Sequence, residues 1–215
     1  MCSAAGLTGR RLPPIAGNSS QEVAVVFADL HLETERLIVR AYTMADLPEL
    51  FAIVSQKAVM EYLPEGVLSR EQTEKALRWI IDCYRQNTPR KIVKFSVGVE
   101  EKSSGRLIGW CGLGPVDFDT SEIEIYYGLS ASQWGRGFTT EAAKALLRYG
   151  FETIGQDRIV ALVKPENIAS QRVIEKLGLI YQKRIGGLPK KFRFYEGLLY
   201  YALTGAEYAR RTGTG

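Results

Sequence analysis

The segment from residue 123 to residue 143, IEIYYGLSASQWGRGFTTEAA, holds the residue types and spacings best suited to chemistry. Just before it and within it, Glu122, Glu124 and Tyr126 alternate along a predicted strand, so they share one face of that strand. A carboxylate there could take a proton from an amine, which attacks a carbonyl only when it is neutral. We choose Glu124 as the base, with Glu122 second. The plain alternative is that both are solvated strand residues.

Two glycines, Gly135 and Gly137, follow this strand and precede a predicted helix that begins at Phe138. Glycine lets a backbone approach a ligand closely, and the amides at a helix start attract anions such as a diphosphate. Arg136 adds a cation at the same place. Gly-x-Gly before a helix is weak evidence by itself, because a tight turn explains it equally well. The absence of GxxxxGK[ST] and GxGxxG disfavours a P-loop and a dinucleotide site.

Composition excludes several other kinds of site. The 215 residues carry a net charge of +4 without a long basic run, so nucleic-acid binding is not expected. Cys2, Cys83 and Cys111 are widely spaced and His31 is the single histidine, which argues against a metal, a disulfide framework and a histidine triad. No stretch approaches the roughly 18 apolar residues of a membrane span, and no signal peptide is recognised. We expect a cytoplasmic protein that binds no membrane.

The elements that must position these residues follow from hydrophobic periodicity and capping signals. Helices are predicted over 45–56, 70–86, 138–154 and 167–177, and strands over 34–42, 92–100, 107–114, 121–129, 158–163, 179–185 and 192–203. The order indicates a mixed, mostly antiparallel α/β sheet of about seven strands with helices on both faces. We expect a flexible arm over 1–29, one domain over 30–205 and a tail over 206–215.

Residues 33–203 resemble the GNAT superfamily of N-acetyltransferases, in particular the branch of the ribosomal-protein N-terminal (Rim-type) acetyltransferases. The strand EIYYGLS followed by WGRGFTTEA resembles that branch's acetyl-CoA motif. Residues 160–178, with Asn167-x-x-Ser170 and the EKLGL that runs on to residue 179, resemble its second motif. The resemblance implies a GNAT-like fold in which the strands at 121–129 and 158–163 part, and it implies acetyl-CoA as cosubstrate without a metal.

The resemblance also implies roles for individual residues. The pantetheine arm would bond to the backbone near Tyr127, Gly128 and Leu129, with Asn167 reaching the arm and Ser170 near the sulfur. The diphosphate would lie on the loop and helix start made by Trp134, Gly135, Arg136, Gly137, Phe138 and Thr139. The sequence departs from the family pattern at Trp134, at Thr139 and at Ile174, where a tyrosine general acid is usual.

The mechanism expected from these residues is direct transfer of an acetyl group from acetyl-CoA to a primary amine in a ternary complex. Ser170 or Tyr126 could protonate the leaving thiolate, and a backbone N–H near Tyr127 or Gly128 could hold the oxyanion. The acceptor is either a protein N-terminus or a small-molecule amine. The departures from the family pattern leave one alternative, an acyl-CoA sensor without turnover. The resemblance allows a homodimer.

Overall fold

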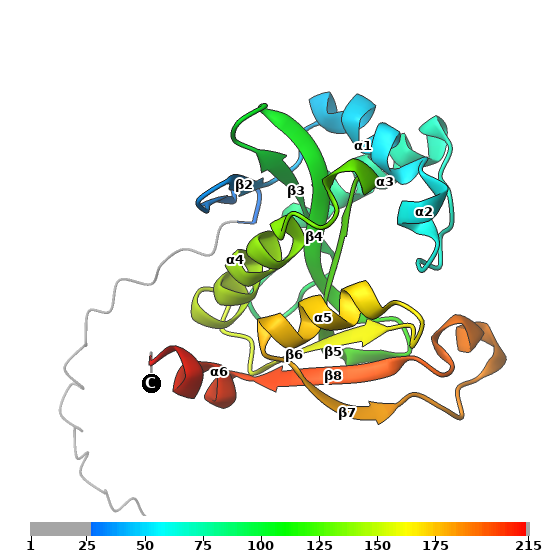
Figure 1. Cartoon of the computed structure of the whole chain (residues 1–215), viewed down its shortest axis with the longest axis vertical. Coiled ribbons are helices and arrows are strands. Elements are labelled where there is room, and N and C mark those ends of the chain that lie inside the picture. The colour runs from blue at the N-terminus through cyan, green and yellow to red at the C-terminus, as the bar shows by residue number, and fades with distance from the viewer. Residues whose placement is uncertain (1–26, 214–215) are drawn as a thin grey trace, which may run out of the picture.

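An eight-stranded sheet organises residues 27–213, the part of the chain that this computed structural model describes (Figure 1). The strands lie in the order β1-β2-β3-β4-β5-β6-β8-β7, and every neighbouring pair is antiparallel except β5 and β6. Their bounds are β1 His31–Glu33, β2 Leu37–Arg40, β3 Phe95–Glu101, β4 Arg106–Val116, β5 Asp119–Leu129, β6 Arg158–Val163, β7 Ile180–Arg184 and β8 Leu199–Thr204. The predicted mixed, mostly antiparallel sheet is confirmed. The additional strand is β1, which is too short to show a periodic pattern.

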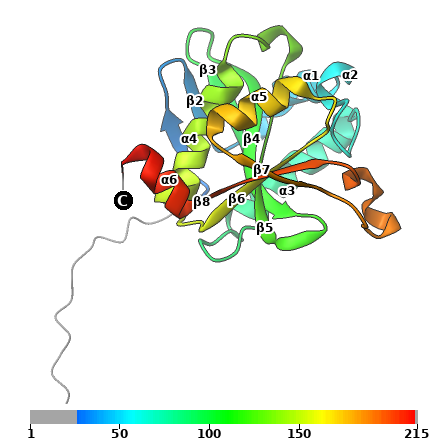
Figure 2. The same cartoon turned by 60° about the horizontal axis from the view of Figure 1, so that its bottom comes forward.

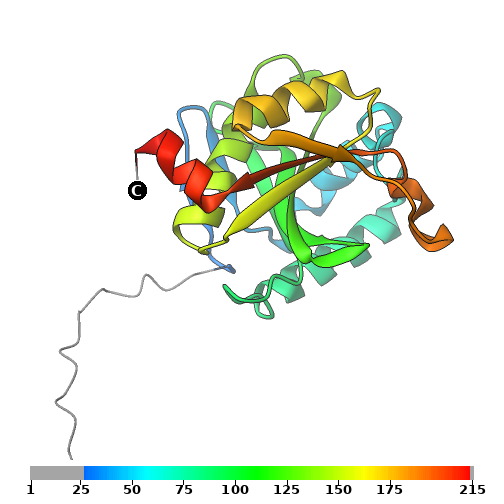
Figure 3. The ribbon, with the colours of Figure 1, turned by 90° about the horizontal axis from the view of Figure 1, so that it is seen from below.

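Helices cover both faces of this sheet, as predicted. They are α1 Leu47–Val54, α2 Lys57–Met60, α3 Arg70–Tyr84, α4 Phe138–Glu152, α5 Ile168–Leu177 and α6 Gly205–Thr212, with 3-10 turns at Met44–Asp46, Ala131–Gln133 and Lys190–Tyr195. In Figure 3, α5 lies above the sheet and α3 lies below it. None of the helices within residues 27–213 is long and apolar enough to cross a bilayer.

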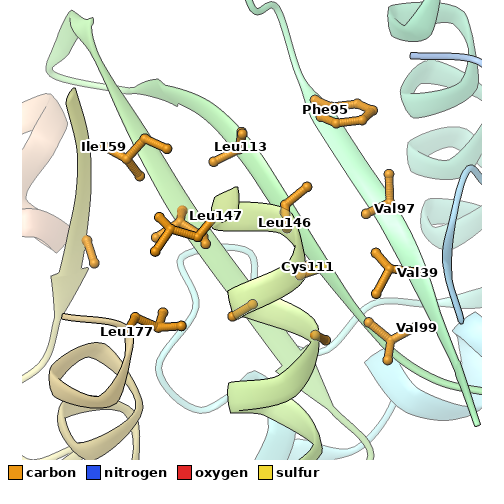
Figure 4. Close-up of a cluster of buried hydrophobic side chains, with 14 of the residues drawn as sticks. Val39, Phe95, Val97, Val99, Cys111, Leu113, Leu146, Leu147, Ile159 and Leu177 are labelled. Atoms are coloured by element: carbon orange, nitrogen blue, oxygen red, sulfur yellow. The ribbon is translucent and has the colours of Figure 1, made fainter. Parts of the chain in front are cut away.

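The main core fixes α4 over the sheet. Phe95, Val97 and Val99 alternate along β3, are completely buried, and join Leu146 and Leu147 of α4 in one cluster (Figure 4). Truncating such a buried leucine to alanine typically costs about 2–5 kcal/mol. This packing sets the position of α4, and with it the position of the helix start next to the end of β5.

Local signals in the sequence define several helix ends. The Ser69 hydroxyl accepts a hydrogen bond from the Gln72 amide, and the Gln72 side chain accepts one from the Ser69 amide, so the two residues form a capping box at the start of α3. Gly178 ends α5 with a φ of 88°, as expected for a left-handed C-terminal cap. Asn167 caps the start of α5 by accepting the Ser170 amide at 3.0 Å.

The prediction of a strand over 192–203 was wrong in its first half. Residues 190–195 form a 3-10 turn, and only Leu199–Thr204 pair as β8. Phe118, in the turn between β4 and β5, makes edge contacts with the rings of Phe192 and Tyr195. The Tyr195 hydroxyl also donates to the carboxylate of Asp117. These tertiary contacts hold the segment against the β4–β5 turn and override its β propensity.

The predicted domain limits need correction at both ends. Residues 206–215 were expected to be a tail, but α6 stacks Tyr208 on Phe151 with ring centroids 4.7 Å apart, so this helix belongs to the domain. Phe27 was assigned to the arm, yet it is buried and its ring meets that of Phe95 edge-on at 4.9 Å. The rest of the predicted arm, residues 1–26, lies outside the described residues.

Candidate active site

Strands β5 and β6 lie side by side but separate after a single paired position. Their parallel register is recorded only at Glu124 and Val160. Beyond that point the two ribbons diverge (Figure 2). The amide of Leu162 on β6 donates to the Glu124 side chain at 3.3 Å. A side chain therefore occupies a position where a continued ladder would place a backbone carbonyl.

A pocket of about 320 Å³ opens where these strands separate. Its walls come from β5, β6, the start of α5, helices α1 and α3, and the segment before β8. Among the residues that line it are Tyr42, Tyr62, Glu65, Trp79, Lys94, Glu124, Tyr126, Tyr127, Lys164, Asn167, Ser170, Ile174, Phe194 and Tyr195. Glu124, Tyr126, Asn167 and Ser170, which the sequence singled out, thus meet in one cavity.

The Glu124 carboxyl is the titratable group at the junction of the strands. Burial raises the pKa of Glu124 to about 7, although the Leu162 amide and the charge of Lys94 act in the opposite direction. A group with this pKa is divided between its acid and base forms near neutral pH. It can therefore accept a proton from a bound substrate and release it again.

The two carboxylates that alternate along β5 have different surroundings. Glu122 is not among the residues that line the pocket, and its carboxylate lies 3.4 Å from the guanidinium of Arg158. Glu124 has no such cation within ion-pair distance among the described residues. Glu122 and Glu124 share one face of β5, as predicted. Glu122, the second candidate base, nevertheless lies outside the cavity.

Adjacent tyrosines of β5 point to opposite sides of the sheet. The Tyr126 ring lies directly over Gly112, where an added Cβ would approach it to 2.3 Å, so this position accepts only glycine without rearrangement. The Tyr127 hydroxyl lies on the α5 side, 3.0 Å from the Ser170 hydroxyl. Tyr127 was assigned only a backbone role from the sequence, so the structure adds its hydroxyl to the site.

The Ser170 and Tyr127 hydroxyls line the same pocket as the buried Ile174. Burial raises the pKa of Tyr127 well above its ordinary value, so this hydroxyl stays protonated at neutral pH. Tyr126 likewise keeps its proton, because burial raises its pKa. Both tyrosine hydroxyls therefore stay neutral and can donate hydrogen bonds, but neither can act as a base at neutral pH.

The start of α4 has the features of an anion site. Gly137 precedes the helix with a φ of 81°, and Gly135 has a φ of 76°. No side chain within the described part of the chain caps the first amides of α4. Lys144 and Lys176 line a second, open pocket together with Gly137, Thr140 and two carboxylates, Glu35 and Glu141, of which Glu141 is paired with Arg36. No sequence motif marks these two lysines, which come together through the packing of α4 against α5.

Other residues of the predicted coenzyme loop have partners within the protein. The indole N–H of Trp134 donates to the Leu129 carbonyl at 2.9 Å, which fixes the loop to the end of β5. Arg136 is in an ion pair with Glu101 at 3.1 Å. Its guanidinium also lies over the Phe138 ring, 4.5 Å from the centroid. The Leu129 carbonyl is therefore bound by the Trp134 side chain, and the Arg136 guanidinium by the Glu101 side chain. Among the described residues, no side chain binds Gly128 or Thr139 in this way.

Within residues 27–213 no group of histidine, cysteine and carboxylate side chains could hold a metal ion. Cys83 and Cys111 are buried free thiols, and burial raises the pKa of both. Neither thiol lines the pocket, so neither is part of the site.

Comparison with known proteins fits this geometry. Residues 36–180 match the family model described as an acetyltransferase (GNAT) domain. The chain is 32% identical over 175 residues to YkkB of Bacillus subtilis (strain 168), an alignment that covers 80% of the chain and 98% of YkkB. It is 30% identical over 169 residues to YoaA of the same organism, an uncharacterized N-acetyltransferase, covering 79% of the chain and 91% of YoaA.

Solved structures agree with the fold. The GNAT-family acetyltransferase from Bacillus anthracis superposes with a TM-score of 0.70 at 26% identity, covering 83% of this chain and all of that one. RimL, a ribosomal L7/L12 alpha-N-protein acetyltransferase in complex with coenzyme A, superposes with a TM-score of 0.66 at 18% identity, covering 81% and 98%. The chain belongs to the GNAT family of acetyltransferases.

Proposed function

We propose that this protein is an N-acetyltransferase that moves an acetyl group from acetyl-CoA to a primary amine by direct attack in a ternary complex. The observation that carries the proposal is the position of Glu124. Its carboxylate stands where β5 and β6 separate, and it lines a pocket that extends from Ser170 to the segment before β8. A base at this junction can serve an amine that enters from one side and an acyl donor from the other.

Three features of the chain suit coenzyme A. The gap between β5 and β6 leaves backbone groups near Tyr127 and Gly128 for the pantetheine arm. The uncapped amides that follow Gly137 suit the diphosphate, because aligned helix amides attract negative charge. Lys144 and Lys176 would supply cations beside these amides, a role that the engaged Arg136 is less free to take.

The chemistry follows from the pocket residues. Glu124 accepts the proton from the attacking amine, either directly or through a water molecule. The amine nitrogen forms a bond to the thioester carbonyl carbon, and a backbone N–H near Tyr127 or Gly128 stabilises the resulting oxyanion. The carbon–sulfur bond then breaks, the Ser170–Tyr127 hydroxyl pair can stabilise the thiolate by a hydrogen bond, and the thiolate takes its proton from solvent. A thiol pKa of about 8.5 makes this anion a tolerable leaving group even without an acid at Ile174.

The fold similarity to RimL supports, at 18% identity, a relationship to the Rim-type branch and keeps a protein N-terminus among the possible acceptors. A small-molecule amine is the other class. A cytoplasmic location accords with two buried free thiols, because a reducing compartment keeps cysteines unpaired. The homodimer stays a prediction from the family resemblance.

The proposal is tested by mixing the protein with acetyl-CoA and a panel of peptide and small-molecule amines and by measuring thiol release. We expect release that depends on the amine, together with an acetylated product detected by mass spectrometry. Tight acetyl-CoA binding without release for any amine would instead support an acyl-CoA sensor.

A further inference from the structure

Lys94 lines the part of the pocket where we expect the amine substrate. Its ammonium group has no hydrogen-bond acceptor among the described residues. Its Nζ lies 4.0 Å from the centroid of the Tyr126 ring, and within residues 27–213 it makes no ion pair or hydrogen bond. Lys164, which lines the same pocket, differs because its Nζ donates to the Phe194 carbonyl at 3.0 Å. Lys94 is partly buried, and an ammonium that is partly removed from water without a hydrogen-bond acceptor is disfavoured, a cost that contact with an aromatic face offsets only in part.

The register of the sheet aligns Lys94 with Glu124. Glu124 pairs with Gly114 on β4, and the pairing of Leu113 with Phe95 brings Gly114 beside Lys94, the residue before Phe95. The two side chains thus lie one on each side of a glycine, with backbones about 10 Å apart across two strand spacings. An added Cβ at Gly114 would lie 3.5 Å from the Lys94 side chain, so the lysine runs across this bare position.

Lys94 and Glu124 influence each other without touching. Burial lowers the pKa of Lys94, and the charges of Glu65, Glu124 and Asp117 act in the opposite direction. The charge of Lys94 in turn lowers the pKa of Glu124. No ion pair joins the two groups, so a positive and a negative side chain face one cavity with space between them.

Two further charged side chains, Glu65 and Lys164, line the pocket, but most of its remaining wall is apolar or aromatic. Tyr62, Trp79, Phe194 and Tyr195 line the pocket, together with aliphatic residues of α1 and α3. Such walls favour a ligand with an apolar body, while the few polar groups fix its orientation. The Tyr126 ring that contacts the Lys94 ammonium packs over Gly112, where any larger residue would displace it.

We propose that the acetyl acceptor is a small amino carboxylate with an apolar side chain, whose carboxylate binds Lys94 and whose amine faces Glu124. This inference rests on the proposed acetyl transfer. The carboxylate of the substrate supplies the hydrogen-bond acceptor that the Lys94 ammonium lacks. The proton of the substrate amine passes to Glu124 as the nitrogen is acetylated. Lys94 is then a specificity-determining residue that contacts the substrate.

The experiment compares matched acceptors: L-phenylalanine, its amide and 2-phenylethylamine, and the same three forms of leucine. With the native protein we expect kcat/KM for the free amino acid to exceed that for the amide and for the decarboxylated amine by at least about tenfold, as a charged hydrogen bond allows. Lys94→Met should lower kcat/KM for the amino acid by about 10- to 100-fold, mostly through KM, and should leave the decarboxylated amine nearly unchanged. Lys94→Arg should retain part of the preference.

Lys91→Met is the matched control, because Lys91 is exposed and three residues away, and it should leave the preference intact. Acetyl-CoA affinity of each variant checks that it is folded. Equal kcat/KM for the three forms, or a preference for peptide N-termini, would overturn the inference and leave acetyl transfer standing. No transfer to any amine despite acetyl-CoA binding would remove the proposed function, and this inference with it.

Discussion

The Glu124 carboxylate accepts the Leu162 amide across the junction of β5 and β6, at 3.3 Å. This contact joins two strands that share one backbone register position. The side chain both ends the ladder and places an ionisable group at the point where the pocket opens. Structure and chemistry at the junction thus depend on the same carboxyl group.

Glu124→Gln should lower kcat by at least about 100-fold, the usual contribution of a general base, with acetyl-CoA affinity nearly unchanged. Steady-state kinetics and calorimetric binding measure the two effects. Glu122→Gln is the control, since Glu122 pairs with Arg158 outside the pocket, and it should change kcat only slightly. Equal losses in the two variants would remove Glu124 from the role of base.

The activity should depend on pH through the same group. With a pKa of about 7, Glu124 becomes the base form as pH rises, so kcat/KM should rise tenfold per pH unit below about 7 and level off above it. The measurement is the pH profile of acetyl transfer at low amine concentration, corrected for the fraction of amine that is neutral. A corrected profile that stays flat between about pH 5 and 8 would contradict this assignment.

Glu124→Gln should also stabilise the folded protein at high pH. Because the folded pKa is raised above the unfolded value near 4.5, ionisation opposes folding, so native stability declines from about pH 4.5 to pH 7 and is constant above. The variant lacks this ionisation, so at pH 8 its free energy of unfolding should exceed that of the native protein by about 3 kcal/mol, with little difference at pH 4. Urea unfolding at both pH values tests this; a variant less stable at pH 8 would argue against the raised pKa.

Gly137→Val should reduce acetyl-CoA affinity by about 10-fold or more, because the side chain adds bulk beside the amides of α4. The residue has a φ of 81°, so valine also strains the backbone by about 1–2 kcal/mol. Gly155→Val is the matched control, since Gly155 has a φ of 78°, has open space around it and does not line either pocket. Equal coenzyme affinity in the two variants would mean that the diphosphate does not lie at this helix.

Asp46→Asn should lower the free energy of unfolding by about 3 kcal/mol near pH 7, because it breaks a largely buried ion pair with Arg40 at 2.7 Å. Burial alone would raise the pKa of Asp46, but hydrogen bonds from Arg40 and Thr43 hold it below its ordinary value. The contribution is therefore present above the unfolded pKa near 3.8 and is lost as pH falls through the lower folded value. Denaturant unfolding should show a variant difference that shrinks below about pH 4; a constant difference would contradict the linkage.

Much of the fold was predictable because it follows from local signals. Ser69 and Gly178 mark helix ends by capping chemistry, and β6 has the predicted bounds, Arg158–Val163. Tyr195 shows the limit of such signals. Its segment has strand-like composition, yet contacts with Asp117 and Phe118 determine its conformation, and these residues are about 78 positions away in the sequence.

The pocket was predictable only in part for a similar reason. Period two placed Glu122 and Glu124 on one face, but the position of β6 determines which of them reaches the cavity. No sequence motif identifies Lys94 as a residue of the site, because its place beside Glu124 depends on the register of three strands. The hydroxyl contact of Tyr127 with Ser170 likewise depends on where α5 packs.

A crystal structure of the protein with coenzyme A tests the central claim most directly. We predict a diphosphate within hydrogen-bond distance of the amides that follow Gly137, and a pantetheine arm that runs between β5 and β6 toward Ser170. A coenzyme bound elsewhere, or β5 and β6 paired along their full length, would contradict the account.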